Sequence, residues 1–284
     1  MGERSSDPEP MRIIGLQAQK DTGFVDIHCH FLPEMDDGAT SWGEAISMAR
    51  MAVNDGFTRL IVTPHQLGNY RLNTAERIRK QAEEFRSQLG SAGIPLEVRV
   101  GGDVRVEPDL LEQLDDGKVL SLADQSRHLL LELPHELYFP IEHLVSELER
   151  RGYQAILSHP ERNQGILARP AIITDLMSVG CLMQVTAGSF VGAFGSPSKS
   201  LAERMLAENA IHFVATDAHG TRFRRPRMSR AFDAITKLAS ADVAQELCSV
   251  NPSRVYRGRS VPVGNVRPNF EAETRRWFSF GRRA

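Results

Sequence analysis

Short apolar runs rich in β-branched residues alternate with segments of helical period along most of this chain, and this alternation limits the folds open to it. Runs of this kind, bounded by glycine, proline or polar residues, are typical of buried strands. Strands that are joined by helices in regular alternation are expected to be parallel. The seven runs begin at Phe24, Arg59, Leu96, His128, Gln154, Leu182 and Ile211.

Seven strand and helix units in one chain favour a closed or nearly closed α/β barrel over an open doubly wound sheet. The 284 residues, 41% of them hydrophobic, can bury the core of one barrel-sized domain. We therefore expect a single barrel domain over residues 23–258, with a flexible N-terminal extension over 1–22. Residues 259–284 form a tail rich in arginine and aromatic residues, for which a loosely packed extension is the simplest expectation.

Composition excludes several classes of protein. The formal net charge of -2 argues against a protein that coats nucleic acid. Three widely spaced cysteines do not make a disulfide framework, and they suit a reducing compartment. No run approaches the roughly 18 apolar residues of a spanning helix, and the first residues lack the apolar core of a signal peptide. We expect a cytoplasmic protein without a membrane span. The sequence leaves open whether the protein forms a homo-oligomer.

Candidate metal ligands stand at the C-terminal ends of the expected strands, where barrel enzymes carry their sites. The first strand ends in His28-Cys29-His30, and because side chains two apart share one face of a strand, both imidazoles can bind one ion. Asp217 and His219 repeat this spacing at the end of the last strand. The other candidates are Asp37, His65, Asp103, Glu132 and His159.

Nine candidate ligands exceed what one ion can bind, so we expect two or three divalent ions with bridging carboxylates. A single histidine at a strand end is more often a hydrogen-bonded core residue, and the prediction depends on the joint pattern. Mixed imidazole and carboxylate ligands suit Mn, Zn or Fe better than Ca or Mg.

Six segments resemble, in order, motifs of the PHP phosphoesterase superfamily, and the likeness spans about residues 24–256. Within that superfamily, DDG at 36–38, HPER at 159–162 and the pair Arg225-Pro226 are similar to the bacterial CpsB/YwqE-type tyrosine-protein phosphatases, which regulate capsule and exopolysaccharide synthesis. The six segments are HCHFLPEMDDG, VTPH, GGD at 101–103, LLLELP, LSHPERN and VATDAH.

This resemblance implies a distorted seven-stranded (β/α)7 TIM-like barrel, the PHP fold, with three metal ions, usually manganese. It implies hydrolysis of phosphotyrosine through a metal-activated water. The implied partner is a phosphotyrosine protein, such as the tyrosine-rich tail of a bacterial autokinase. The implied ligand sets are His28, His30, Asp103 and Asp217 for one ion, Asp103, Glu132 and His159 for a second, and Asp37, His65 and His219 for a third.

The arginines of the family map to Arg162 and Arg225, which are expected to clamp the phosphoryl group because a guanidinium matches phosphate oxygens bidentately. Arg225 lies in the arginine-rich segment 221–230, which suits an anion. Asp103 departs from the resemblance, because these phosphatases ordinarily carry glutamate there, and a side chain one methylene shorter changes the bridging between the first two ions.

Other interpretations remain. The ligand set is shared across PHP enzymes, so a histidinol-phosphate phosphatase or a phosphodiesterase-type nuclease is an alternative. Amidohydrolase barrels also begin with His-x-His, although they commonly use a carboxylated lysine on a middle strand, where this chain has none. A metal-stabilised scaffold without turnover is the non-enzyme alternative, which the departure at Asp103 favours.

The segment CSVNPSR at 248–254 has the Cys-x5-Arg spacing of thiol-dependent tyrosine phosphatases. That mechanism needs a loop of backbone amides around the phosphate and a thiol of lowered pKa. The segment lacks glycine, and Pro252 has no amide to donate. We interpret the spacing as coincidental.

Overall fold

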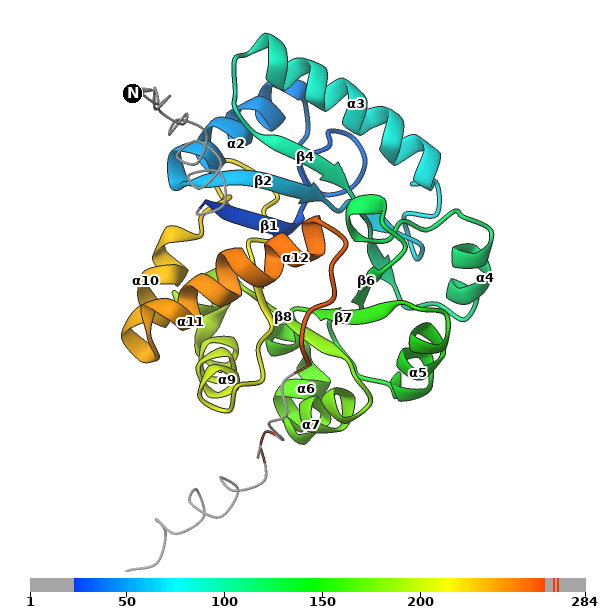
Figure 1. Ribbon diagram of the computed structural model, residues 1–284, viewed down its shortest axis with the longest axis vertical. Coiled ribbons are helices and arrows are strands. Elements are labelled where there is room, and N and C mark those ends of the chain that lie inside the picture. Colours follow the sequence, from blue (N-terminus) through cyan, green and yellow to red (C-terminus); the bar gives the residue numbers. More distant parts are fainter. Residues whose placement is uncertain (1–22, 264–267, 269, 271–284) are drawn as a thin grey trace, which may run out of the picture.

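Parallel strands surrounded by helices make up the computed structural model, which describes residues 23–263, 268 and 270 (Figure 1). Within these residues the strands form two sheets, with the orders β1-β2-β4 and β3-β5-β6-β7-β8-β9. Every pair of neighbouring strands is parallel. The strands are β1 (Phe24–Cys29), β2 (Phe57–Val62), β3 (His65–Gln66), β4 (Glu97–Val100), β5 (Asp103–Arg105), β6 (His128–Glu132), β7 (Gln154–Ser158), β8 (Leu182–Thr186) and β9 (Phe213–Ala215).

The single closed barrel of seven strands expected from the sequence is not found, because two of the expected strands are each divided in two. The run from Arg59 gives β2 and β3, separated at Pro64, which has no N–H for a ladder hydrogen bond. The run from Leu96 gives β4 and β5, separated at Gly101 and Gly102. A Cβ on Gly102 would lie 2.2 Å from the Oε1 atom of the buried Gln66, so a side chain there would displace that amide.

Main-chain contacts connect the two sheets at both seams. Between β1 and the segment after β9, the Asp217 amide donates to the His28 carbonyl oxygen at 2.8 Å, and Cys29 forms an isolated bridge with Ala218. At the other seam, the chain passes directly from β2 into β3 and from β4 into β5, and the amide of Asp103 in β5 donates to the carbonyl oxygen of Pro64 at 3.2 Å. The C-terminal ends of the strands of both sheets therefore lie at one mouth.

Helices follow most of the strands and cover the outside of the sheets (Figure 1). Ser41 caps the first of these helices, because its side chain accepts a hydrogen bond from the Glu44 amide. The helices are α2 (Trp42–Asp55), α3 (Ala75–Ser91), α4 (Leu110–Asp115), α5 (Glu142–Arg150), α6 (Gln164–Ala168), α7 (Ala171–Ser178), α8 (Ala187–Phe190), α9 (Gly195–Ala207), α10 (Ser229–Leu238), α11 (Ala241–Gln245) and α12 (Asn251–Tyr256), with the shorter helices η1 (Leu122–Asp124), η2 (Pro160–Arg162) and η3 (Glu246–Val250).

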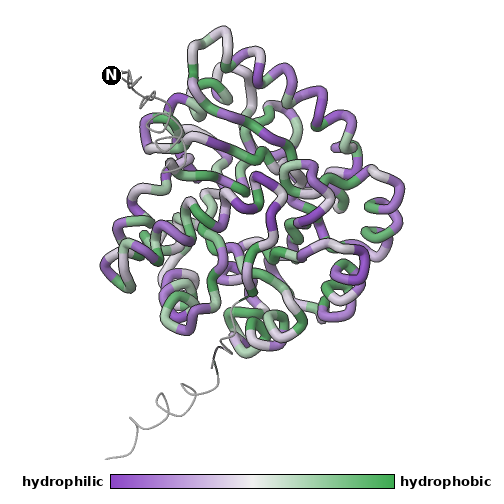
Figure 2. Tube along the Cα trace, viewed as in Figure 1, coloured by the Kyte–Doolittle hydropathy of each residue, from purple (hydrophilic) through white to green (hydrophobic). Residues whose placement is uncertain are grey.

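Apolar side chains fill two regions of the core. The larger cluster lies between the strands and the surrounding helices, and it includes Phe31, Phe57 and Phe85. The smaller cluster is contributed by strands of both sheets and by α12, which packs on β1. Hydrophobic residues dominate the strands in Figure 2, whereas the outer helix α3 is largely hydrophilic. Burial on both faces explains why the strands read as nearly continuous apolar runs.

The described part of the chain beyond residue 258 packs against the fold. Val261 is buried, and its carbonyl oxygen accepts a hydrogen bond from Gln154 at 3.1 Å. Phe270 is also buried, and its ring lies 4.9 Å from the guanidinium carbon of Arg204. The domain boundaries stay predictions, and residues 1–22 lie outside the described part. Among the described residues, no helix has the length and apolar character needed to span a membrane.

Candidate metal centre

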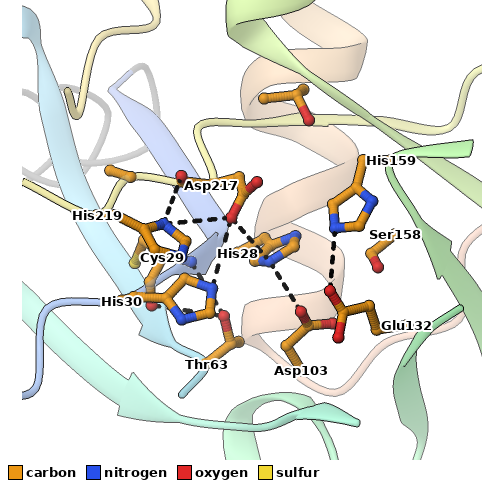
Figure 3. A network of polar contacts seen from close by, with 12 residues as sticks. His28, Cys29, His30, Thr63, Asp103, Glu132, Ser158, His159, Asp217 and His219 are labelled. Carbon is orange, nitrogen blue, oxygen red and sulfur yellow. Dashed lines mark hydrogen bonds and ion pairs between the residues drawn. The ribbon is translucent and has the colours of Figure 1, made fainter. Parts of the chain in front are cut away.

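All nine candidate ligands gather at the C-terminal ends of the strands, and Figure 3 labels all of them except Asp37 and His65. Within the described residues, four groups of three or four side chains place one ligand atom each within 4.8 Å of one another. Convergence of this kind follows from the parallel arrangement, which brings all the strand ends to one mouth. The groups are His30, Asp37, His65 and His219; His28, His30 and Asp103; His28, His159 and Asp217; and His65, Asp103 and Glu132.

His28, in β1, and His30, directly after that strand, are both buried and lie at the base of the cluster. His28 Nε2 lies 3.4 Å from Asp103 Oδ2 and 3.3 Å from Asp217 Oδ1. His30 Nε2 lies 3.5 Å from the same oxygen of Asp217. The expectation that two imidazoles separated by one residue face the same place is met, while Cys29 is buried in the main core.

Asp37 and two histidines stand at the outer edge of the cluster. Asp37 Oδ1 lies 3.4 Å from His65 Nε2 and 3.2 Å from His219 Nε2, which is the third ligand set implied by the resemblance. The members of the second set fall into two of the four groups, although His159 Nε2 lies 3.8 Å from Glu132 Oε1. His65 Nδ1, at 3.2 Å from Asp103, joins Asp103 and Glu132, whereas His159 joins His28 and Asp217.

Hydrogen bonds behind the cluster orient its imidazoles. His28 Nδ1 lies 2.7 Å from Gln184 Oε1, and His30 Nδ1 lies 2.7 Å from Asp36 Oδ2. Each contact turns the Nε2 atom of the same ring toward the centre, as in other metal sites whose ligands are held from behind. Neither Gln184 nor Asp36 is among the candidate residues predicted from the sequence. A polar residue inside the apolar run of β8 and the first aspartate of DDG were the available signals.

Glycine is required at the third position of DDG. A Cβ on Gly38 would lie 2.3 Å from the carbonyl oxygen of His30. The Asp36 carboxylate also accepts hydrogen bonds from the amides of Gly38 and His65, both at 2.9 Å. Asp36 therefore folds this loop onto the cluster, and Asp37 projects from it as a ligand.

The segment HPER contains both a candidate metal ligand and an arginine that contacts the cluster. His159, just before η2, has a left-handed backbone with φ of 34°, which is uncommon for a residue with a side chain and recurs at functional sites. Glu161 is buried and points away from the cluster, where it accepts hydrogen bonds from the Thr186 amide at 2.9 Å and the Ser189 hydroxyl at 2.7 Å. This anchor holds His159 and Arg162 over the mouth.

Several buried polar atoms of the cluster have no hydrogen-bond partner, although buried polar groups are nearly always paired. They face one another across the centre, and imidazole nitrogens together with carboxylate oxygens are the donors that divalent transition metals prefer. The residues present therefore fit a centre of more than one divalent ion. The unpaired atoms include His28 Nε2, His30 Nε2, His65 Nδ1, both oxygens of Asp103, Asp217 Oδ1 and His219 Nε2.

The carboxylates crowded into the cluster raise the pKa of two of its histidines. Burial opposes a charge on His28, but Asp103 and Asp217 outweigh it and raise its pKa to about 9. Burial likewise opposes a charge on His65, while the nearby carboxylates of Asp103 and Asp37 raise its pKa to about 12. Protons on these two rings balance the negative charge, and a divalent cation competes with them for the same nitrogen atoms.

Two arginines contact the cluster at Asp217. Arg162 Nη1 donates a hydrogen bond to Asp217 Oδ2, and Arg224 Nη2 forms an ion pair with the same oxygen. Arg224 Nη1 also lies 3.8 Å from Asp37. Arg225, to which the resemblance assigns the second position, is exposed and donates from Nε to the carbonyl oxygen of Arg222. A left-handed backbone at Arg224, with φ of 46°, turns that side chain inward in place of its neighbour.

The alternative site at Cys248 does not have the properties of a nucleophile. The thiol is completely buried, and burial raises its pKa above the ordinary value. The segment 248–254 runs through the helices η3 and α12, so it forms no open loop of amides. A thiolate mechanism needs the opposite environment, and the Cys-x5-Arg spacing is coincidental, as the sequence argument concluded.

Known proteins resemble the chain over nearly all of its described length. The family described as "Capsular polysaccharide synthesis, CpsB/CapC" matches residues 24–257. The tyrosine-protein phosphatase YwqE of Bacillus subtilis is 36% identical over 215 residues, which cover 75% of this chain and 84% of that protein. The tyrosine-protein phosphatase CpsB of Streptococcus pneumoniae is 26% identical over 237 residues, covering 81% of this chain and 97% of that protein.

The fold is similar to a solved structure from the same group of proteins. It comes from crystallographic work on YwqE from Bacillus subtilis and CpsB from Streptococcus pneumoniae, which are described as metal-dependent tyrosine phosphatases. The TM-score is 0.82 at 33% sequence identity, and the match covers 86% of this chain and 99% of the other.

Proposed function

Because this chain belongs to the CpsB/CapC family of capsular polysaccharide synthesis proteins, we propose that it is a metal-dependent protein-tyrosine phosphatase. The observation that carries the proposal is the convergence of nine imidazole and carboxylate ligands beneath two arginines that reach the same aspartate. This arrangement combines cation sites with guanidinium groups, and both bind the oxygens of a phosphoryl group.

Two or three divalent ions, manganese foremost with zinc or iron as alternatives, would be held by the four groups of ligands described above. When bound, such ions lower the pKa of water and neutralise charge on phosphoryl oxygens. Asp103 lies between His28 and His65 and is the candidate for a bridging ligand. Gln184 and Asp36 hold the imidazoles in the tautomer whose Nε2 lone pair faces the centre.

Arg162 and Arg224 would bind the phosphoryl oxygens of the substrate. The Arg162 guanidinium packs over the ring of Phe194 at 4.1 Å, so its position is fixed before substrate arrives. Both arginines share Asp217 Oδ2, which keeps two positive charges beside each other at the mouth. Charge that develops on the phosphoryl oxygens during transfer is stabilised by such preorganised donors. A tyrosine leaving group, with an ordinary pKa of about 10, needs less protonation than an alkoxide.

The finer expectations from the sequence belong to this proposal. We propose that the two sheets are arcs of one distorted seven-stranded barrel, which the main-chain hydrogen bonds at both seams support. The substrate would be a phosphotyrosine protein of capsular or exopolysaccharide synthesis, and the tyrosine-rich tail of an autokinase is the candidate that the family suggests.

The decisive experiment is hydrolysis of p-nitrophenyl phosphate, a phosphotyrosine peptide and histidinol phosphate by chelated protein to which Mn, Zn or Mg is restored. We expect metal-restored activity on the two aryl phosphates that is lost in His159→Ala. Cys248→Ser is the matched control, because its thiol is buried away from the cluster, and it should retain activity. Metal-independent activity that Cys248→Ser abolishes would overturn the proposal, and preference for histidinol phosphate would favour the other PHP reaction.

A further inference from the structure

A cavity of about 240 Å³ opens directly beside the metal centre. Two residues of the cluster, His65 and Glu132, form its inner wall. Tyr70, from the loop after β3, and Arg105, at the end of β5, also line it. Apolar cavities of about 150 Å³ in proteins accept a benzene molecule, so this one has room for a single aromatic ring.

The Tyr70 ring is stacked on a candidate ligand. Its centroid lies 5.2 Å from that of the His65 ring, and the two planes are inclined by 21°. A tight turn sets this position, because the Tyr70 amide donates to the Leu67 carbonyl oxygen at 2.8 Å. Leu67 and Gly68 both have left-handed backbones, with φ of 64° and 50°. A strained turn that presents an aromatic ring beside a cluster of ligands is a feature of a built site.

Buried hydrogen bonds anchor the loop that carries Tyr70. The Asn73 side-chain amide donates to the carbonyl oxygens of Met35 at 2.7 Å and His65 at 2.9 Å. Gln66 donates to the Asn73 carbonyl oxygen at 2.7 Å and accepts from the Leu120 amide at 2.8 Å. Tyr70 is therefore held in place in the protein alone, and a ligand need not order it.

The Arg105 side chain is also held in place. Arg105 Nη1 lies 3.4 Å from Glu132 Oε2 and from the carbonyl oxygen of Leu133. A Cβ on Gly68 would lie 3.1 Å from Arg105 Cγ, so glycine lets the arginine stem lie against the turn. The lining of the cavity thus includes an aromatic ring and a guanidinium with its stem, and both kinds of surface bind aromatic rings.

We propose that this cavity, which we call the ring slot (lined by His65, Gly68, Tyr70, Arg105 and Glu132), binds the aryl ring of the phosphate ester, and that Tyr70 determines specificity for aryl over alkyl esters. The inference rests on the proposed phosphatase function, because a phosphoryl group at the cluster places its ester substituent in the adjoining space. A tyrosyl ring spans the slot, whereas the single methylene of phosphoserine would bring the peptide backbone against its walls.

Binding of two phosphonates to the manganese-loaded protein tests this inference without turnover. Phenylphosphonate carries the ring, and methylphosphonate carries only the anionic head. By calorimetry, wild-type protein should bind phenylphosphonate more tightly. Tyr70→Ala should weaken phenylphosphonate binding by about 2- to 12-fold, the range for an aromatic pair, and leave methylphosphonate unchanged. Tyr70→Phe should retain the preference.

Leu72→Ala is the matched control, because Leu72 lies two residues away in the same loop, is 81% exposed and does not line the ring slot. Equal binding of the two phosphonates by wild-type protein, or equal weakening of both by Tyr70→Ala, would overturn the proposal. Failure of the proposed function would show itself separately, as absence of phosphomonoester hydrolysis with any metal, and the phosphonate preference would still report on the slot.

Discussion

Protons held by the histidines of the cluster should be released when a divalent metal binds. Although burial opposes it, neighbouring carboxylates raise the pKa of His28 to about 9 and that of His65 to about 12. Both rings are therefore protonated in chelated protein at neutral pH. A histidine that ligates a metal must give up the proton on the ligating nitrogen, so binding and proton release are linked.

The number of protons follows from these values. At pH 8, His28 is about nine-tenths protonated and His65 fully so, which predicts release of about two protons from these two rings. At pH 9, His28 is half deprotonated, and the release from the two rings falls to about 1.5. At pH 6.5 the release is larger, because Glu132, whose pKa burial and Asp103 raise to about 7, is mostly protonated, and because His30, whose pKa Asp36 and Asp217 raise against burial, adds to it. His219 adds none, since burial and His30 lower its pKa to about 4.

Calorimetric titration of chelated protein with Mn²⁺, repeated in buffers of different ionisation enthalpy, measures this release. His65→Gln should lower it by about one proton at pH 8. His143→Gln, in an exposed residue of α5, is the control and should change nothing. Release of no protons, or release that rises between pH 6.5 and 9, would refute the reasoning, because the histidines would then be neutral before metal binds.

Three further predictions concern the arginines, the glycines and a core histidine. Arg224→Ala should lower kcat/KM for p-nitrophenyl phosphate about 100-fold, while Arg225→Ala, in an exposed side chain, should change it less than about threefold. Gly38→Ala should destabilise by about 1–3 kcal/mol in denaturant unfolding, since its Cβ would lie 2.3 Å from a carbonyl oxygen; Gly90→Ala, in open space on a helix, should stabilise by about 0.5–1 kcal/mol. Burial lowers the pKa of His212 to about 4. The unfolded chain therefore binds its proton first, and the free energy of unfolding should fall by about 3 kcal/mol between pH 6.5 and 4. His212→Asn should lose that dependence.

The set of candidate ligands could be predicted from the chain because their position at strand ends depends on local order. A strand has a period of two, and parallel strands bring their C-terminal ends together, so His28 and His30 had to share a face. The same reasoning predicts that Glu132 and Asp217 lie at the mouth, where the structure has them. The nine candidates and the nine members of the observed groups are the same residues.

Contacts between distant segments could not be predicted in this way. Gln184 contacts His28 Nδ1 although the two residues are 156 positions apart in the sequence. Asp36 contacts His30 Nδ1 because Gly38 allows the DDG loop to fold back against His30. The choice of Arg224 over Arg225 depends on one left-handed backbone conformation, for which adjacent arginines in the sequence offer no distinction.

The chain alone therefore determines the alternation of strands and helices and the set of ligands at the mouth, because both follow from periodicity and chain direction. The tertiary structure decides that two expected strands are divided, at Pro64 and at Gly101, and that the sheets meet at two seams. It also decides which arginine faces the cluster and where the ring slot opens. These features arise from packing among residues remote in sequence, and local periodicity carries no information about such packing.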